Sequence, residues 1–245
     1  MRTFISKFAM VFNEILKPFG IKLISVKTDI FNMHSAILRI YRHGIKVDNI
    51  IDIGASNGIW SSNALPHFPQ SKFVAIEPLS ERKTSLQNLA NKYHNFDYEL
   101  CVAGEADGVY ATLNVADDLD GSTVNGHGGQ SRQVPVKMID TIVFDRNLTG
   151  SFLLKFDTHG YEVQILKGAL ETLKNTSVII MEVYNFRITE NSLRFHEMCA
   201  HMETLGFRCY DIVDLMVRDY DNAFWQMDIC FCRSDSKIFH YAQYL

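Results

Sequence analysis

The sequence predicts an α/β fold with a doubly wound, mostly parallel sheet of seven strands, preceded by N-terminal helices. Two observations support this prediction. Between residues 49 and 233, short apolar runs alternate with stretches of helical periodicity, and strands that alternate with helices form right-handed crossover units in a parallel sheet. The chain also has 245 residues, of which 47% are hydrophobic, enough to bury the core of one large domain.

The N-terminal segment, residues 1–46, is expected to be helical and to precede a main domain at residues 47–245. Apolar residues at helical spacing predict an amphipathic helix over residues 3–17. A second helix is expected from Asp29 to His43, where Gly44 ends it. The first helix could pack against the main domain, or it could contact a partner or a membrane surface.

Seven short apolar runs predict the strands of the main domain. They occupy residues 50–53, 72–77, 98–103, 152–156, 178–183, 207–213 and 227–232. Helical periodicity predicts helices over residues 59–65, 80–93, 160–174 and 192–205. Gly, Asp, Asn and Ser dominate residues 104–135, which we expect to form a long loop. Such a loop inside a compact domain is usually functional or mobile.

Composition and charge exclude several classes of protein. The net charge is −4, which argues against the clustered basic surface that nucleic-acid binding requires. The longest apolar run, Phe8 to Phe12, has five residues, whereas a membrane span needs roughly 20. The five cysteines include no C-x-x-C pair, so we expect buried free thiols rather than a disulfide framework or a zinc knuckle.

The N-terminus is not typical of a secretory signal. Lys7 and Glu14 interrupt its apolar stretch, and no small-residue cleavage site follows. We therefore expect a cytoplasmic protein without a transmembrane segment.

The first strand of the sheet leads into a glycine-containing turn, Asp52-Ile-Gly54-Ala-Ser56-Asn-Gly58. In such sheets, ligands bind beyond the carboxyl ends of the strands. Glycines allow a sharp turn and a close backbone approach, and the next helix offers its N-terminal N–H groups. The turn is not a dinucleotide fingerprint, because Ser56 and Ile59 stand where G-x-G-x-x-G needs glycine. This departure disfavours a nicotinamide oxidoreductase.

The second and third strands also end in candidate binding residues. Glu77, before Pro78, could accept hydrogen bonds from both hydroxyls of a ribose, or it could cap the helix that follows. Cys101, Val102 and Ala103 form a small apolar edge that suits the face of an adenine, although plain core packing would explain them equally well.

The fourth and fifth strands bring ionisable residues to the same edge. The fourth leads into Lys155-Phe156-Asp157-Thr158-His159-Gly160-Tyr161-Glu162, and the fifth contributes Glu182. Buried ionisable groups are costly unless they are paired or functional. Each of these residues also has a purely structural explanation. Glu162 could cap a helix, His159 could be a surface or capping residue, and Lys155 could pair with an acid.

These segments, in this order, resemble the FkbM family of S-adenosylmethionine-dependent methyltransferases. The most specific part is the block from Leu154 to Ala169, which matches the family run lKiD-x-x-G-x-E-x-x-x-L-x-G. The resemblance covers residues 47–233 and implies a class I methyltransferase fold of the Rossmann-like type. Ser56 departs from the pattern, since many methyltransferases have a second glycine there.

The resemblance also implies the roles of individual residues. The methionine end of S-adenosylmethionine would lie against Asp52, Gly54, Ser56 and Gly58. Glu77 would bind the ribose hydroxyls, and Cys101 with Val102 would border the adenine. Asp157 would lie near the amino group of the cofactor or near the reacting centre.

A hydroxyl acceptor would need a general base, because alcohols are weak nucleophiles at neutral pH. We expect His159 to be this base, since a helix N-terminus favours the neutral imidazole. Asp157 or Glu182 would orient the ring or stabilise it once it is protonated. The same three residues could instead hold a divalent metal, although we assign no metal to the site.

The sequence therefore predicts an O-methyltransferase that acts on a hydroxyl of a sugar, a glycan precursor or a natural product. Tyr184, Asn185 and Trp225 could form a stacking surface for a sugar ring, or they could simply be half-buried. The alternative function is a non-catalytic relative of the fold that binds a partner through the N-terminal helix and residues 117–131.

Overall fold

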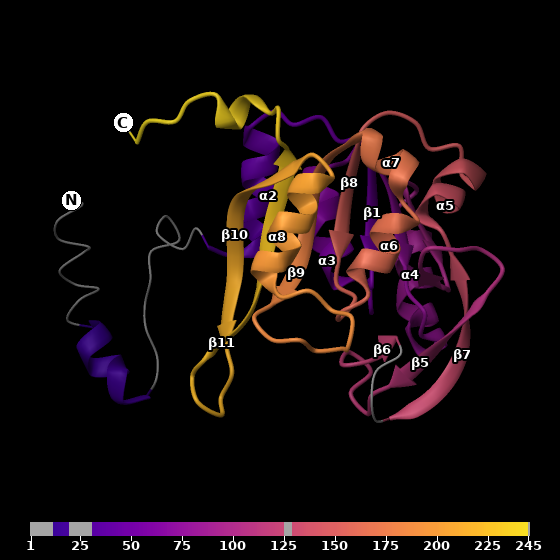
Figure 1. Cartoon of the computed structure of the whole chain (residues 1–245), viewed down its shortest axis with the longest axis horizontal. Coiled ribbons are helices and arrows are strands. Elements are labelled where there is room, and N and C mark those ends of the chain that lie inside the picture. The colour runs from indigo at the N-terminus through magenta and orange to yellow at the C-terminus, as the bar shows by residue number, and fades with distance from the viewer. Residues whose placement is uncertain (1–11, 20–30, 125–128, 245) are drawn as a thin grey trace.

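The computed structural model of the chain describes residues 12–19, 31–124 and 129–244. In this part of the chain, a seven-stranded sheet occupies the centre and helices cover both of its faces (Figure 1). A second sheet of four strands lies beside it, at the lower right of the view in Figure 1.

The large sheet has the strand order β10-β11-β9-β8-β1-β2-β3. Its strands are β1 (Asn49–Ile53), β2 (Lys72–Ile76), β3 (Phe96–Glu99), β8 (Phe152–Phe156), β9 (Thr176–Tyr184), β10 (Phe207–Val217) and β11 (Phe224–Arg233). Neighbouring strands are parallel except that β11 is antiparallel to both β9 and β10. The predicted doubly wound, mostly parallel sheet of seven strands is confirmed.

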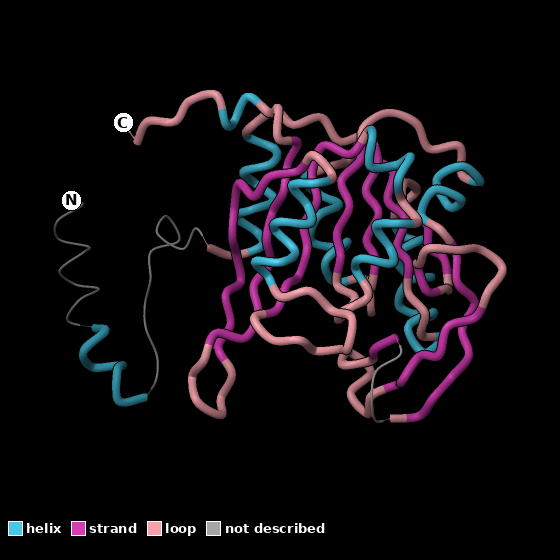
Figure 2. The backbone as a smooth tube through the Cα atoms, viewed as in Figure 1, coloured by secondary structure: helices cyan, strands magenta, loops and turns pink. Residues whose placement is uncertain are grey.

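Helices lie on both faces of this sheet (Figure 2). The side chains between sheet and helices form two separate cores, one on each face. One face carries α2 (Met33–Arg42), α3 (Ile59–Ala64) and α4 (Lys83–Lys92). The other carries α5 (Ile139–Asp145), α6 (Glu162–Lys167), α7 (Leu170–Lys174) and α8 (Phe195–Thr204). Because the central strands are covered on both faces, β1 and β8 are buried at every position and have nearly continuous apolar sequences.

The prediction for residues 98–135 is wrong in two respects. The expected third strand is divided, because β3 ends at Glu99 and β4 (Val102–Ala103) belongs to the second sheet. The expected loop over residues 104–135 contains most of that sheet. Its order is β4-β7-β5-β6, with β5 (Tyr110–Val115), β6 (Thr123–Val124) and β7 (Gln130–Lys137).

The pattern of β5 explains why this sheet was missed. Ala111, Leu113 and Val115 are buried, and Thr112 and Asn114 between them are half-buried. A strand with only one buried face alternates apolar with polar residues. Its composition therefore resembles that of a loop, especially beside the glycine-rich segment that follows.

The helix α5 was not predicted. Most of the other elements differ from the predictions mainly at their ends. The helix expected over residues 160–174 is divided into α6 and α7 around Gly168, where an added Cβ would lie 1.9 Å from the carbonyl oxygen of Gly104. Among the described residues, the second N-terminal helix begins at Met33, and the Asn32 side chain caps it. Most of the helix expected over residues 3–17 lies outside the described residues. The part that the structure describes is helical at residues 12–16.

None of the helices in the described part of the chain is long and apolar enough to cross a membrane.

Candidate functional site

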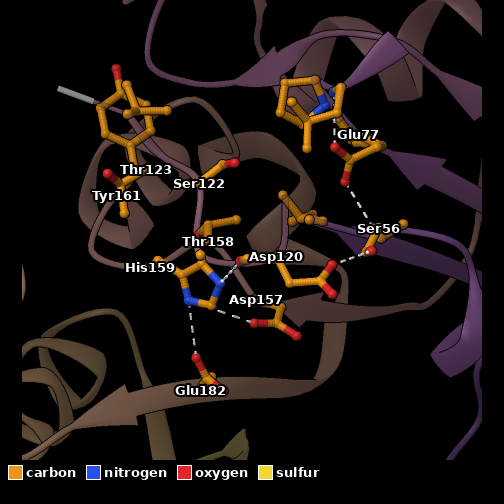
Figure 3. Close-up of a pocket in the computed structure, with 18 of the residues that line it drawn as sticks. Ser56, Glu77, Asp120, Ser122, Thr123, Asp157, Thr158, His159, Tyr161 and Glu182 are labelled. Carbon is orange, nitrogen blue, oxygen red and sulfur yellow. Dashed lines mark hydrogen bonds and ion pairs between the residues drawn. The ribbon is translucent and has the colours of Figure 1, made fainter. Parts of the chain in front are cut away.

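A cavity of about 860 Å³ opens at the carboxyl ends of the central strands. It lies where the strand order reverses between β1 and β8, the usual ligand site of an open α/β sheet. The loops after β1, β2, β8 and β9 line it, together with the segment between β5 and β6 (Figure 3). Its volume is within the range of small-molecule sites.

The turn after β1 has the backbone geometry that its glycines suggest. Gly54 has φ +77°, and a Cβ there would lie 1.9 Å from the carbonyl oxygen of Asp157. Ser56 also adopts a positive φ, +46°, a conformation that glycine tolerates best. Gly58 is not among the residues that line the cavity, and a Cβ there would lie 2.4 Å from a methyl carbon of Leu89 on α4.

Asp52 is a buried carboxylate that is only partly satisfied by the protein. The hydroxyl of Ser61 donates to its Oδ2 over 2.7 Å, whereas Oδ1 has no hydrogen-bond partner among the described residues. Burial raises the pKa of Asp52 to about 6, although the positive charge of Lys155 acts in the opposite direction. An unpaired buried acceptor is costly, and a positively charged ligand group would satisfy it.

Glu77 is held at the end of β2 by two backbone groups. The N–H of Ser56 and the N–H of Leu79 each donate to its carboxylate over 2.8 Å. Glu77 is 4% exposed, and burial raises its pKa. Cys101 and Val102 are buried and line the same cavity. Burial raises the pKa of the Cys101 thiol to about 12, which makes it an inert, apolar part of the wall.

Asp157, after β8, is half-buried and forms an ion pair with the buried Lys155. The Nζ of Lys155 donates to Asp157 Oδ2 over 2.7 Å, so the expectation that Lys155 pairs with an acid is confirmed. Burial opposes the ionisation of Asp157, but the positive charges of Lys155 and His159 outweigh it and lower the pKa of Asp157.

His159 has hydrogen-bond partners at both ring nitrogens. Its Nε2 lies 2.8 Å from the carbonyl oxygen of Asp120. Its Nδ1 lies 2.8 Å from the hydroxyl of Tyr184 and 3.2 Å from Glu182 Oε1. Burial disfavours the imidazolium, but the carboxylates of Glu182 and Asp157 outweigh it and raise the pKa of His159 to about 9. The charged ring is therefore the main form at neutral pH, contrary to the neutral imidazole expected from a helix N-terminus.

Glu162 is a buried carboxylate in the first turn of α6, the helix that follows His159. Glu162 Oε1 accepts hydrogen bonds from the N–H of Gly160 over 2.8 Å and from the hydroxyl of Thr158 over 3.1 Å. Glu162 thus complements the dipole of α6 from its first turn, as considered, but these two partners belong to the loop before the helix. The raised pKa of His159 follows from the carboxylates of Glu182 and Asp157.

Glu182 and the aromatic residues beside it form the wall of the cavity near His159. The hydroxyl of Tyr184 and the amide of Gln226 donate to the Glu182 carboxylate. Tyr184 meets Trp225 edge to face, with ring centres 5.8 Å apart, and Trp225 stacks on Phe186 at 5.3 Å. Tyr184 and Trp225 line the cavity, whereas Asn185 does not.

The structure brings together most of the predicted site residues and adds one that the sequence did not identify. The cavity lining includes Asp52, Gly54, Ser56, Glu77, Cys101, Val102, Asp157, His159 and Glu182. Asp120 was missed, although its backbone and side chain both contact these residues (Figure 3). The only feature of the sequence that could have indicated Asp120 is its place in a glycine-rich segment of unusual length.

Asp157, His159 and Glu182 could also supply ligands to a metal ion, since one ligand atom from each lies within 4.8 Å of the others. These three side chains already have partners in the protein, however. Lys155 binds Asp157, and Tyr184 lies against both His159 and Glu182. A cation would have to displace these contacts, and the ammonium of Lys155 would repel it.

The chain was compared with protein families, curated proteins and solved structures. A family model described as the methyltransferase FkbM domain matches residues 52–209. No curated protein matched.

Several solved methyltransferases are similar to the chain at low sequence identity. Methyltransferase FkbM from Methylobacillus flagellatus KT is 19% identical with a TM-score of 0.47, and the match covers 77% of this chain and 46% of that one. The chain thus spans less than half the length of that protein. N-methyltransferase NodS from Bradyrhizobium japonicum WM9 is 9% identical with a TM-score of 0.48, over 82% of this chain and 93% of that one.

Proposed function

This chain belongs to the FkbM methyltransferase family, and from this membership we propose that it is an O-methyltransferase. The acceptor would be a hydroxyl of a sugar, a glycan precursor or a natural product. The family has the class I methyltransferase fold and uses S-adenosylmethionine as its cofactor. The attack on oxygen, the class of acceptor and the roles of the residues are proposals.

The residues along the cavity fit the three parts of this cofactor. We assign the methionine end to Asp52, Gly54 and Ser56, where the unpaired Asp52 Oδ1 is available for an amino group. Glu77 would hold the ribose hydroxyls, since each of its oxygens accepts only one backbone hydrogen bond and can accept another. Cys101 and Val102 would border the adenine. When bound, the cofactor supplies a methyl group that is already activated on a sulfonium.

The observation that best supports methyl transfer to oxygen is the position of His159. It lines the same cavity as the proposed cofactor residues, and a hydroxyl acceptor must lose a proton during the reaction. The Asp120 carbonyl can only accept a hydrogen bond, so the neutral ring would carry its proton on Nε2. This tautomer leaves Nδ1, on the side of Tyr184 and Glu182, to accept the proton from the acceptor.

The raised pKa of His159 limits this role at neutral pH. With a pKa of about 9, only about 1% of the ring would be neutral at pH 7 without the cofactor. A positive charge placed beside Asp157 would lower this pKa, because like charges disfavour the imidazolium. The rate is therefore expected to rise with pH. Asp157 and Glu182 would stabilise the ring after it has taken up the proton.

Two measurements test the proposed function. Calorimetry should detect S-adenosylhomocysteine binding, and its absence would overturn the cofactor assignment. Incubation with methyl-labelled S-adenosylmethionine and a panel of sugars and other alcohols should give a methyl ether, identified by NMR. Transfer to nitrogen or carbon instead would refute the O-methyl assignment. A methylated product of any kind would exclude the non-catalytic alternative.

The proposal also includes the absence of an essential metal. Turnover should be unchanged after treatment with EDTA, because protein groups already bind the side chains of Asp157, His159 and Glu182. Loss of activity that added Mg²⁺ restores would contradict this. Three further expectations stay predictions. They are the cytoplasmic location, the division of the chain at residue 46, and contact with a partner or membrane through the N-terminal helix.

A further inference from the structure

The segment Ala116–Ser122, which joins β5 to β6, lies against the cavity and has an internal structure of its own. The N–H of Leu119 donates to the carbonyl of Ala116 over 3.0 Å, and the hydroxyl of Ser122 donates to the carbonyl of Leu119 over 2.6 Å. The Asp118 carboxylate accepts from the N–H of Gly121 over 3.0 Å. These short-range bonds give the segment a defined turn.

Asp120, within this segment, contacts the loops that follow three strands of the large sheet. The hydroxyl of Ser56, after β1, donates to Asp120 Oδ1 over 2.7 Å. Arg82, after β2, donates to the same oxygen over 2.5 Å. His159, after β8, contacts the carbonyl oxygen of Asp120 over 2.8 Å. One residue of the segment between β5 and β6 therefore links three loops beside the proposed cofactor site. Figure 3 shows its contacts with Ser56 and His159.

Strained backbone is found at the same contacts. Ser56, Leu119 and His159 have φ values of +46°, +67° and +50°. Residues other than glycine rarely adopt this conformation, and it persists only where the surroundings hold it. Asp120 contacts two of these residues directly and follows the third in the chain.

We propose that Asp120 is a positioning residue, which latches the segment Ala116–Ser122 as a cover over the cofactor end of the cavity. The cover must open for the cofactor to enter and for S-adenosylhomocysteine to leave. When it closes, the Asp120 carbonyl also holds the neutral His159 ring in the tautomer with the proton on Nε2, so that Nδ1, beside Tyr184 and Glu182, carries no proton and can act as the base. This inference rests on the proposed binding of the cofactor in the cavity.

The contacts predict a specific kinetic effect. A latch that keeps the cover closed slows both the entry and the exit of the ligand. Its removal should therefore raise the association and dissociation rates of S-adenosylhomocysteine together and leave Kd nearly unchanged. A residue that binds the cofactor directly would behave differently. Its removal would raise the dissociation rate alone and weaken Kd by the same factor.

Stopped-flow fluorescence can measure both rates, because Trp60 and Trp225, the two tryptophans of the chain, line the cavity. In Asp120→Ala, both rates should rise by about tenfold, as expected for the loss of one or two hydrogen bonds to a charged group. Arg82 does not line the cavity, so Arg82→Ala should give a smaller effect of the same kind. In the double variant the rates should equal those of Asp120→Ala, since Arg82 acts through Asp120.

Asp117→Ala is the matched control, because it removes an exposed aspartate from the same segment and should leave both rates unchanged. A rise in the dissociation rate alone, unchanged rates in Asp120→Ala, or an equal effect of Asp117→Ala would each overturn the latch. If the wild-type protein did not bind S-adenosylhomocysteine at all, the proposed function would fall with it. Unchanged rates in a protein that does bind would overturn the latch alone.

Discussion

Replacement of Glu182 by glutamine is expected to lower the pKa of His159 from about 9 to about 7. Glutamine keeps the size of the side chain and can still accept a hydrogen bond, but it removes the negative charge beside the ring. The structure places Glu182 Oε1 3.2 Å from Nδ1 of His159 and Asp157 Oδ1 4.0 Å from it. Glu182 is therefore the nearer of the two carboxylates.

The expected size of the shift follows from this distance. Two unit charges 3.2 Å apart attract by about 5 kcal/mol at an effective dielectric constant of about 20, which corresponds to almost 4 pKa units. Part of this attraction offsets the burial of the ring, which lowers the pKa. Asp157 remains in the variant and still favours the charged form. A net fall of about 2 units is therefore expected.

NMR titration of ¹³C-labelled histidine can measure this pKa. The chain has 9 histidines, and the spectrum of His159→Gln would identify the resonance of interest. Glu203→Gln, which alters an exposed glutamate on α8, is the control and should leave the His159 pKa unchanged. A wild-type pKa below about 7, or a shift of less than about 0.3 units in Glu182→Gln, would refute the argument.

Three further predictions concern the same site. His159→Gln should bind S-adenosylhomocysteine as the wild type does, but should lower turnover by about 10²–10⁴-fold, the usual contribution of a general base; an unchanged rate would remove His159 from the mechanism. Glu77→Ala should weaken S-adenosylhomocysteine binding in calorimetry by about tenfold or more, because a charged hydrogen-bonding group is lost; unchanged affinity would contradict the ribose assignment. Because the pKa of His159 rises from 6.5 to about 9 on folding, the charged ring stabilises the folded state. This contribution is fully present below pH 6.5 and is lost as the pH rises through 9. The difference in unfolding free energy between wild type and His159→Gln, measured with urea, should therefore shrink by about 3 kcal/mol between pH 6 and pH 10; a constant difference would contradict the assigned pKa.

The sequence was sufficient to predict the large sheet and most of the residues at its functional edge. The buried strands β1 and β8 are mostly apolar because helices cover both faces of the sheet, and only Asn49, Asp52 and Lys155 interrupt them. Parallel strands place the residues that follow them at one edge, so Asp52, Glu77 and Asp157 could be expected to lie together. The block from Leu154 to Ala169 identified the family, which the match over residues 52–209 shows independently.

Other features depend on contacts between residues far apart in the chain, and only the tertiary structure decided them. Half-buried strands mixed with glycine-rich turns have no continuous apolar run, so the second sheet looked like a loop. Asp120 is 64 residues from Ser56 and 39 from His159, and no local pattern predicts that they meet. The charge of His159 likewise depends on its distance from Glu182, because the attraction between two groups is set by their separation in space.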